Sequence, residues 1–218
     1  NVTGTGNVVN ACLDKHIKLC FVSSISTIGK SNTVSDETNR WIKEESFSNY
    51  ATSKHAAEME VWRGIAEGLQ AVIVNPGIIL GEGDPTKSSS NLLPIVFNEF
   101  PFYTKGITAW VDVKDVVKAM FYLMQSPIYA ERFILSAGNY SYYDIFSKMA
   151  HYMHRKPPSI FAGKLLPALV WRWYALKSFI SGKQPTITKE TVRSAQAEQH
   201  FSNKKFLEAN PSFAYTPI

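Results

Sequence analysis

The sequence predicts an α/β protein: a Rossmann-like, doubly wound parallel sheet with a small, mostly helical substrate-binding lobe. Two short apolar strands, 18–24 and 71–76, alternate with helical stretches, the order expected of βαβ units. The last third of the chain has helical patterns throughout, which favours a separate lobe. The predicted division is a Rossmann-like catalytic portion over 1–82 and 109–138, and a substrate-binding lobe over 83–108 and 139–218.

The first predicted elements are a helix, a buried strand and a second helix. Apolar residues over 2–17 recur with a period near 3.6, which predicts the first helix. The run Lys-Leu-Cys-Phe-Val-Ser-Ser at 18–24 predicts a buried strand that ends in small polar residues. A polar loop is expected over 29–49. Good helix formers then predict a helix over 50–68, with Gly68 as its C-cap.

The middle of the chain continues the alternation. The run Ala-Val-Ile-Val-Asn-Pro at 71–76 predicts a strand that proline stops. Asp112 is a good N-cap for the helix that follows it. The later predicted elements are a loop over 81–90, a helix over 92–99, an extended piece at 110–111, a helix over 112–125, a strand over 132–136, and helices over about 141–154, 162–181, 186–198 and 202–209.

Composition narrows the class of protein. The chain has 218 residues, of which 45% are hydrophobic and 19% charged, so its core needs no disulfides. Cys12 and Cys20 show no metal-ligand spacing, and we expect a reduced, cytoplasmic protein. His151 and His154 lack a third ligand, so no metal is expected. The net charge of +5 is spread along the chain, and the apolar stretch 161–180 contains cations. We therefore expect neither a nucleic-acid partner nor a membrane span.

Tyr50, Lys54 and Ser24 carry the main chemical signal. Residues four apart on a helix share a face, so a phenol and an ammonium project together. A cation about 4 Å away stabilises a phenolate by about 4 kcal/mol at an effective dielectric near 20. Ser24 follows a buried strand, where open α/β sheets bind ligands, and its hydroxyl can donate to a carbonyl. With ten tyrosines, however, such a pair also arises by chance.

The order of the motifs adds to this signal. Phe-Val-Ser-Ser is followed by Gly29, an acidic pair at 36–37, the Tyr-Lys helix, Asn-Pro-Gly-Ile-Ile-Leu-Gly at 75–81, and Val-Asp-Val-Lys-Asp-Val at 111–116. This succession resembles the extended short-chain dehydrogenase/reductase family over nearly the whole chain.

The resemblance implies an enzyme that uses NAD or NADP. Ser24 would orient the substrate, Tyr50 would exchange the proton, and Lys54 would favour the phenolate and bind the nicotinamide ribose. The cofactor-binding residues that it implies are Val22, Ser23, Tyr50, Lys54, Pro76, Gly77 and Ile78. It also implies a homodimer, for which we expect the outer face of helix 50–68 to form the interface.

The family's glycine-rich phosphate loop is absent. Gly4-Thr5-Gly6 does not match it, because position 9 is valine and no strand precedes it. On the resemblance, that loop belongs upstream, so we expect the chain to be part of a longer enzyme.

Three functions fit these observations: a reductase or dehydrogenase acting on a small carbonyl or hydroxyl compound, a nucleotide-sugar epimerase or dehydratase, and a non-catalytic dinucleotide-binding protein. Sugar dehydratases of the family place an acidic pair at the positions that Ile25 and Ser26 occupy here. The chain therefore lacks the acid and base for dehydration. Nucleotide-sugar enzymes of the family usually carry an arginine shortly before the Val-Asp segment, where it holds the diphosphate of the substrate. Segment 105–110 of this chain has no arginine, and Lys105 is a weaker substitute. All three reactive side chains are present. The sequence therefore favours the reductase. Aromatic residues of the lobe suit an apolar substrate or a plain core: Trp171, Trp173, Tyr174 and Phe179.

Overall fold

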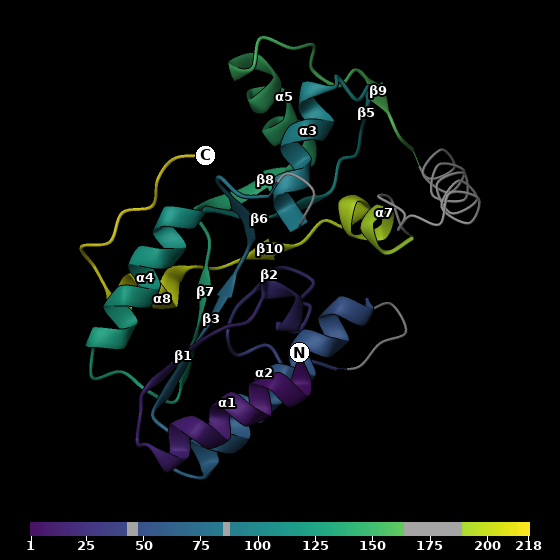
Figure 1. Ribbon diagram of the computed structural model, residues 1–218. Helices are drawn as coiled ribbons and strands as arrows, with labels where there is room; N and C mark the ends of the chain where they lie inside the picture. Colours follow the sequence, from purple (N-terminus) through teal and green to yellow (C-terminus); the bar gives the residue numbers. More distant parts are fainter. Residues whose placement is uncertain (43–47, 85–87, 164–188) are drawn as a thin grey trace. The chain divides into compact units, whose positions relative to one another are not determined.

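The computed structural model describes residues 1–42, 48–84, 88–163 and 189–218 and forms two compact units (Figure 1). The first unit comprises 1–81, 109–139 and 200–218, and the second comprises 82–108 and 140–199. The structure thus assigns 200–218 to the first unit, whereas the sequence analysis places this segment in the lobe. Most of the predicted helix 162–181 and its four aromatic residues lie outside the described residues.

A parallel sheet forms the centre of the first unit. Its strands are β1 (Leu19–Val22), β3 (Ala71–Pro76) and β7 (Glu131–Leu135), in the order β1-β3-β7. The pairing begins at Leu19 opposite Ala71 and at Val72 opposite Glu131. Consecutive strands that run parallel need crossover helices, and helices separate them in the chain. The predicted α/β fold class is therefore confirmed.

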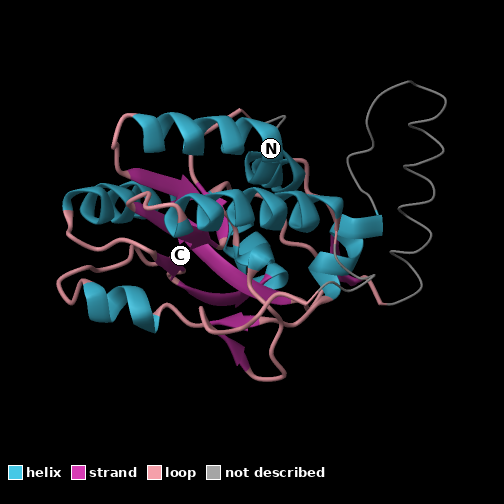
Figure 2. Cartoon of the chain, turned by 90° about the horizontal axis from the view of Figure 1, so that it is seen from below, coloured by secondary structure: helices cyan, strands magenta, loops and turns pink. Residues whose placement is uncertain are grey.

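Helices cover both faces of this sheet (Figure 2). Side chains of β3 alternate between the faces, as the pleat requires. Ala71 and Ile73 pack with α1 (Val2–Asp14) and α2 (Asn49–Ala66) through the buried residues Val9 and Val61. Val72 and Val74 pack with α4 (Val113–Gln125) and α8 (Lys204–Ala209) through Val116, Ala119, Leu123 and Phe206. This two-sided burial explains why β3 reads as a continuous apolar run.

Caps define the ends of two helices, of which Gly68 and Asp112 were predicted and Ser48 was not. Ser48 Oγ accepts a 3.0 Å hydrogen bond from the Ala51 N–H, which fixes the start of α2. At its other end Gly68 adopts φ +102°, a backbone conformation that glycine tolerates best. Asp112 caps α4 by accepting a 2.7 Å hydrogen bond from the Lys114 N–H, as predicted.

Several short elements were not predicted. They are η1 (Ile25–Thr27), β2 (Val34–Ser35), β4 (Ile78–Leu80), β8 (Gly138–Ser141) and β10 (His200–Phe201). β2, inside the predicted polar loop, pairs with β10. β4 pairs in parallel with β6 (Ile107–Asp112), from Ile78 opposite Trp110 to Leu80 opposite Asp112. Strands of two to four residues are too short to show a period.

The second unit contains η2 (Ser88–Asn91), α3 (Leu92–Phe97), β5 (Phe102–Tyr103), α5 (Tyr142–Tyr152), β9 (Ile160–Phe161) and α7 (Lys189–Gln196). Within it α3 packs on α5, and β5 pairs with β9. In the described part of the chain, no helix has both the length and the apolarity to cross a membrane.

Candidate active site

Ser24 lies directly beyond the carboxyl end of β1. Its Oγ accepts hydrogen bonds from the Ser26 N–H (3.2 Å) and the Ser26 hydroxyl (3.0 Å). Its carbonyl oxygen accepts a further bond from Thr27 Oγ1 at 2.8 Å. Because Ser24 Oγ is the acceptor in both of its contacts, its own proton stays available for a ligand.

Lys54 reaches the same end of β1 from helix α2. Its Nζ donates a 2.7 Å hydrogen bond to the Val22 carbonyl and lies 5.1 Å from the centre of the Phe21 ring. Burial lowers the pKa of Lys54, and the nearby charge of Glu58 opposes this shift. An ammonium has three donors, so two remain after the bond to Val22.

Tyr50 stands in the first turn of α2, one turn before Lys54. Its backbone carbonyl accepts a 2.9 Å bond from Ser53 Oγ. The residue is 55% exposed, and its hydroxyl makes no hydrogen bond to any residue that the structure describes. The structure therefore joins Lys54 and Ser24 through the end of β1, and leaves the phenol open to solvent.

The residues expected to bind the cofactor lie at the ends of β1 and β3. Ser23 is buried, and its N–H donates to the Val74 carbonyl at 2.8 Å. The Gly77 N–H donates to the Leu135 carbonyl at 3.0 Å, and Ile78 already belongs to β4. Since Pro76 has no N–H and that of Gly77 is used, these two residues can offer a carboxamide only their carbonyl oxygens.

Glu58 is the site residue that the sequence analysis missed. It is fully buried. Its Oε2 accepts from Ser23 Oγ (2.5 Å), Thr27 Oγ1 (2.7 Å) and Asn75 Nδ2 (3.0 Å), and its Oε1 from Trp62 Nε1 and Arg132 Nη1 (3.4 Å each). The signal was available: a glutamate four residues after Lys54 falls among the apolar residues of the buried helix face.

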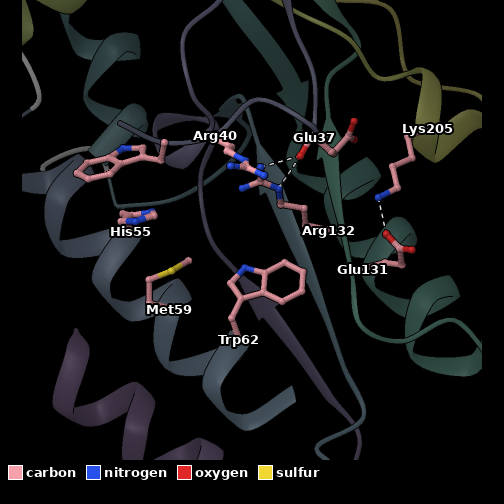
Figure 3. Close-up of a pocket in the computed structure, with 9 residues that line it drawn as sticks. Glu37, Arg40, His55, Met59, Trp62, Glu131, Arg132 and Lys205 are labelled. Atoms are coloured by element: carbon pink, nitrogen blue, oxygen red, sulfur yellow. Dashed lines mark hydrogen bonds and ion pairs between the residues drawn. The ribbon is translucent and has the colours of Figure 1, made fainter. Parts of the chain in front are cut away.

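A hollow of about 520 Å³ opens beside this network (Figure 3). Its lining residues are Glu37, Arg40, Trp41, His55, Met59, Trp62, Glu131, Arg132 and Lys205, which include none of the three predicted catalytic residues. His55 stacks on Trp41 with ring centroids 4.0 Å apart, and burial lowers the pKa of His55. Arg132 donates to the Glu37 carbonyl at 2.7 and 3.0 Å and also contacts Glu58. Arg132 thus connects the hollow to the buried carboxylate.

With this geometry in place, comparison with known proteins identifies the family. Residues 1–133 match the NAD dependent epimerase/dehydratase family. The chain belongs to this family. The predicted resemblance to extended short-chain dehydrogenases/reductases is thereby confirmed.

Two curated relatives of this family member are named as reductases. A dihydroflavonol 4-reductase candidate from Synechocystis sp. is 26% identical over 219 residues, which are 95% of this chain and 63% of that protein. Cinnamoyl-CoA reductase 1 of Petunia hybrida is 30% identical over 147 residues, or 61% of this chain and 44% of the reductase. The chain therefore spans less than two thirds of the length of the curated relatives it matches.

Solved structures support the same fold. The protein gox2253 superposes with a TM-score of 0.78 at 26% identity, over 100% of this chain and 67% of its own. A nucleoside-diphosphate-sugar epimerase from Pseudomonas aeruginosa, PA4631, gives 0.76 at 18% identity, over 96% and 66% of the two chains. At such identity the second likeness establishes the family fold alone.

Proposed function

We propose that this family member is the catalytic part of an NAD(P)-dependent oxidoreductase that reduces or oxidises a carbonyl or hydroxyl group on a small organic substrate. The observation that carries the proposal is the hydrogen bond from Lys54 Nζ to the Val22 carbonyl. It holds a cation at the strand end beside Ser24, one helical turn from the open phenol of Tyr50. This arrangement supports an acid–base site at the strand ends, where open α/β sheets bind ligands.

Each side chain then has a role that its contacts allow. The Ser24 hydroxyl donates to the substrate oxygen and orients it, since that proton is not used within the protein. The Tyr50 hydroxyl gives or takes the proton at that oxygen. Lys54 stays anchored by Val22 and keeps positive charge near the phenol.

The residues present also fit a nicotinamide cofactor. The two remaining Lys54 donors suit the hydroxyls of a ribose, and Val22, Ser23 and the carbonyls of Pro76 and Gly77 line the strand ends where such a ring would lie. When bound, NAD or NADP supplies or accepts the hydride. Ile78, the residue after Gly77, is also among the proposed cofactor-binding residues.

A reductase is favoured over a nucleotide-sugar epimerase. Two relatives that are each 30% identical to the chain are named as reductases: cinnamoyl-CoA reductase 1 and tetraketide alpha-pyrone reductase 2 of Arabidopsis thaliana. The positions after the Ser24 strand end, Ile25 and Ser26, offer no acid and base for dehydration. Epimerase activity is the alternative that the experiment below distinguishes.

The experiment uses the full-length protein with NADPH and NADH, first with a dihydroflavonol, cinnamoyl-CoA and simple aromatic aldehydes, then with UDP-sugars. We expect oxidation of the cofactor with a member of the first set. Tyr50→Phe should lower kcat by roughly 100-fold or more, because it removes the proton donor. Tyr129→Phe is the matched control, since Tyr129 is 56% exposed against 55% for Tyr50. Interconversion of UDP-sugars without net cofactor oxidation would identify an epimerase instead.

We also propose a cytoplasmic homodimer formed through the outer face of α2, the helix expected from the sequence, and we extend this interface to the neighbouring outer face of α1. Supporting this, Val2 and Val8 on α1 and Met59 on α2 are exposed apolar side chains (38%, 49% and 41%). Light scattering after gel filtration tests it: Val8→Glu should convert a dimer into a monomer, and an unchanged mass would exclude this interface.

A further inference from the structure

We propose that Glu58 is a positioning residue for the proposed active site: it fixes the ends of β1 and β3 to helix α2 and keeps a negative charge beside Lys54. The inference rests on the proposed function of Ser24, Tyr50 and Lys54. It goes beyond that function because Glu58 contacts none of the three reactive groups by a hydrogen bond.

The partners of Glu58 come from four different parts of the unit. Ser23 follows β1, Thr27 belongs to η1, Asn75 to β3 and Arg132 to β7, while Glu58 and Trp62 lie on α2. One carboxylate therefore holds together the segments that carry Ser24, the Asn75–Gly77 strand end and Lys54. A displacement of about 1 Å in such a scaffold is enough to cost roughly 100-fold in rate.

The second set of contacts links the network directly to Ser24. Asn75 Nδ2 lies 2.9 Å from Thr27 Oγ1 and 3.2 Å from the Ser24 carbonyl, and its two N–H groups are shared among these acceptors and Glu58. Thr27 Oγ1 lies 2.8 Å from the same carbonyl. Thr27 and Asn75 thus contact both Glu58 and the Ser24 backbone. The position of the Ser24 hydroxyl depends on Glu58 through these two residues.

The donor pattern favours a carboxylate. Ser23 Oγ and Asn75 Nδ2 donate to Oε2, and Trp62 and Arg132 donate to Oε1. The single proton of Thr27 Oγ1 is shared between Oε2 and the Ser24 carbonyl, and the Glu58 side chain is fully buried. A glutamine would have to direct its NH₂ group at the donors on one of the two sides. Burial of this charge is tolerated because each oxygen receives hydrogen bonds.

The charge also acts on Lys54, one helical turn away. The groups that face Lys54 are the Val22 carbonyl and the Phe21 ring on β1 and Glu58 on its own helix. His55 and Arg132 are the other titratable or charged groups around Glu58. Glu58 is therefore the negative charge that opposes loss of the Lys54 proton.

The test compares Glu58→Gln with Glu60→Gln in the full-length protein. Glu60 is the control because it lies on the same helix, is partly exposed and pairs with Arg63 at 3.0 Å. With NADPH and the carbonyl compound that the wild-type protein reduces, Glu58→Gln should lower kcat about 10- to 100-fold. The basic limb of its kcat/KM profile should move to lower pH, because Lys54 loses its proton more easily. Glu60→Gln should change neither quantity.

A second variant covers the case in which Glu58→Gln does not fold. Thr27→Val removes one donor and keeps the charge, so it should lower kcat by roughly three- to tenfold and leave the basic limb in place. The inference is overturned if Glu58→Gln folds and keeps wild-type kcat, or loses activity without any shift of the basic limb, as a purely structural residue would. If Glu58→Gln does not fold, wild-type kcat in Thr27→Val overturns it. These failures are distinguishable from failure of the proposed function, in which Tyr50→Phe would itself retain activity.

Discussion

The Lys54 ammonium lies 2.7 Å from the Val22 carbonyl oxygen, and this hydrogen bond helps to tie helix α2 to the end of strand β1. Lys54→Met keeps an unbranched apolar side chain but removes the cation that lies over the Phe21 ring and the hydrogen bond to Val22. We expect kcat/KM for NADPH-dependent reduction to fall by roughly 100-fold or more, since both charge and cofactor contact are lost. Steady-state kinetics and NADPH fluorescence titration measure the two losses.

Lys204→Met is the control for this variant. Lys204 is 79% exposed and pairs with Glu208 at 3.5 Å on the surface of α8. Surface pairs of this kind contribute little to stability, so the control should behave as the wild type. Equal activity in Lys54→Met and Lys204→Met would contradict the assigned role.

A second prediction concerns the carboxylate of Asp115, which anchors the C-terminal segment. Asp115 is fully buried and accepts hydrogen bonds from the Thr216 N–H (2.6 Å) and Thr216 Oγ1 (3.1 Å). Asp115→Ala should cost about 1.5–3 kcal/mol of unfolding free energy, because it removes the hydrogen bonds to a charged group that hold the tail. Equilibrium urea unfolding gives the free energy, and limited proteolysis reports release of the tail.

Asp112→Ala provides the comparison, since Asp112 caps the same helix from a half-buried position. Loss of a cap costs about 1 kcal/mol. The tail should then resist proteolysis as in the wild type. Similar losses from the two variants, with an intact tail in both, would show that Asp115 does no more than cap.

The strands and helices that could be predicted are those with strong local signals. The apolar run of β3 and the Asp112 cap of α4 each follow from a few neighbouring residues. β2 could not be predicted, because two residues in a polar loop become a strand only by pairing with β10, more than 160 positions later. The same reason explains why 200–218 was placed in the lobe.

In the candidate site, too, residues with local sequence signals could be predicted and those that depend on distant contacts could not. Lys54 and Ser24 could be placed near each other, because a strand end and a helix face are local patterns. The role of Glu58 depends on donors from Ser23 to Arg132, which only the folded chain brings together. Asp115 likewise bonds to Thr216, which lies 101 residues away, so no local pattern reveals its role.

Gly77 gives a third prediction. A Cβ at this position would overlap the Ala109 backbone carbonyl on β6. Gly77→Ala should therefore destabilise the protein by about 1–3 kcal/mol, as overpacking does. Gly4→Ala should act in the opposite direction, because nothing lies within 4 Å of its added Cβ and alanine favours a helix by up to about 1 kcal/mol over glycine. Urea unfolding of both variants measures this difference in sign, and a neutral Gly77→Ala would contradict the close approach of β4 to β6.

His55 makes stability depend on pH. Burial lowers the pKa of His55 in the folded state, despite the opposing charge of Glu58, so the unfolded chain takes up this proton first as pH falls. Between the unfolded value near 6.5 and the lower folded value, the unfolded state binds more protons, and stability falls with pH. His55→Phe keeps an aromatic ring against Trp41 and removes this titration. Its unfolding free energy should therefore decrease less than that of the wild type between pH 7.5 and 5.5, as measured by urea unfolding.

Met59→Leu, in the same hollow, retains the imidazole and should retain the wild-type decrease. Parallel curves for His55→Phe and the wild type would mean that the stacked imidazole titrates alike in both states.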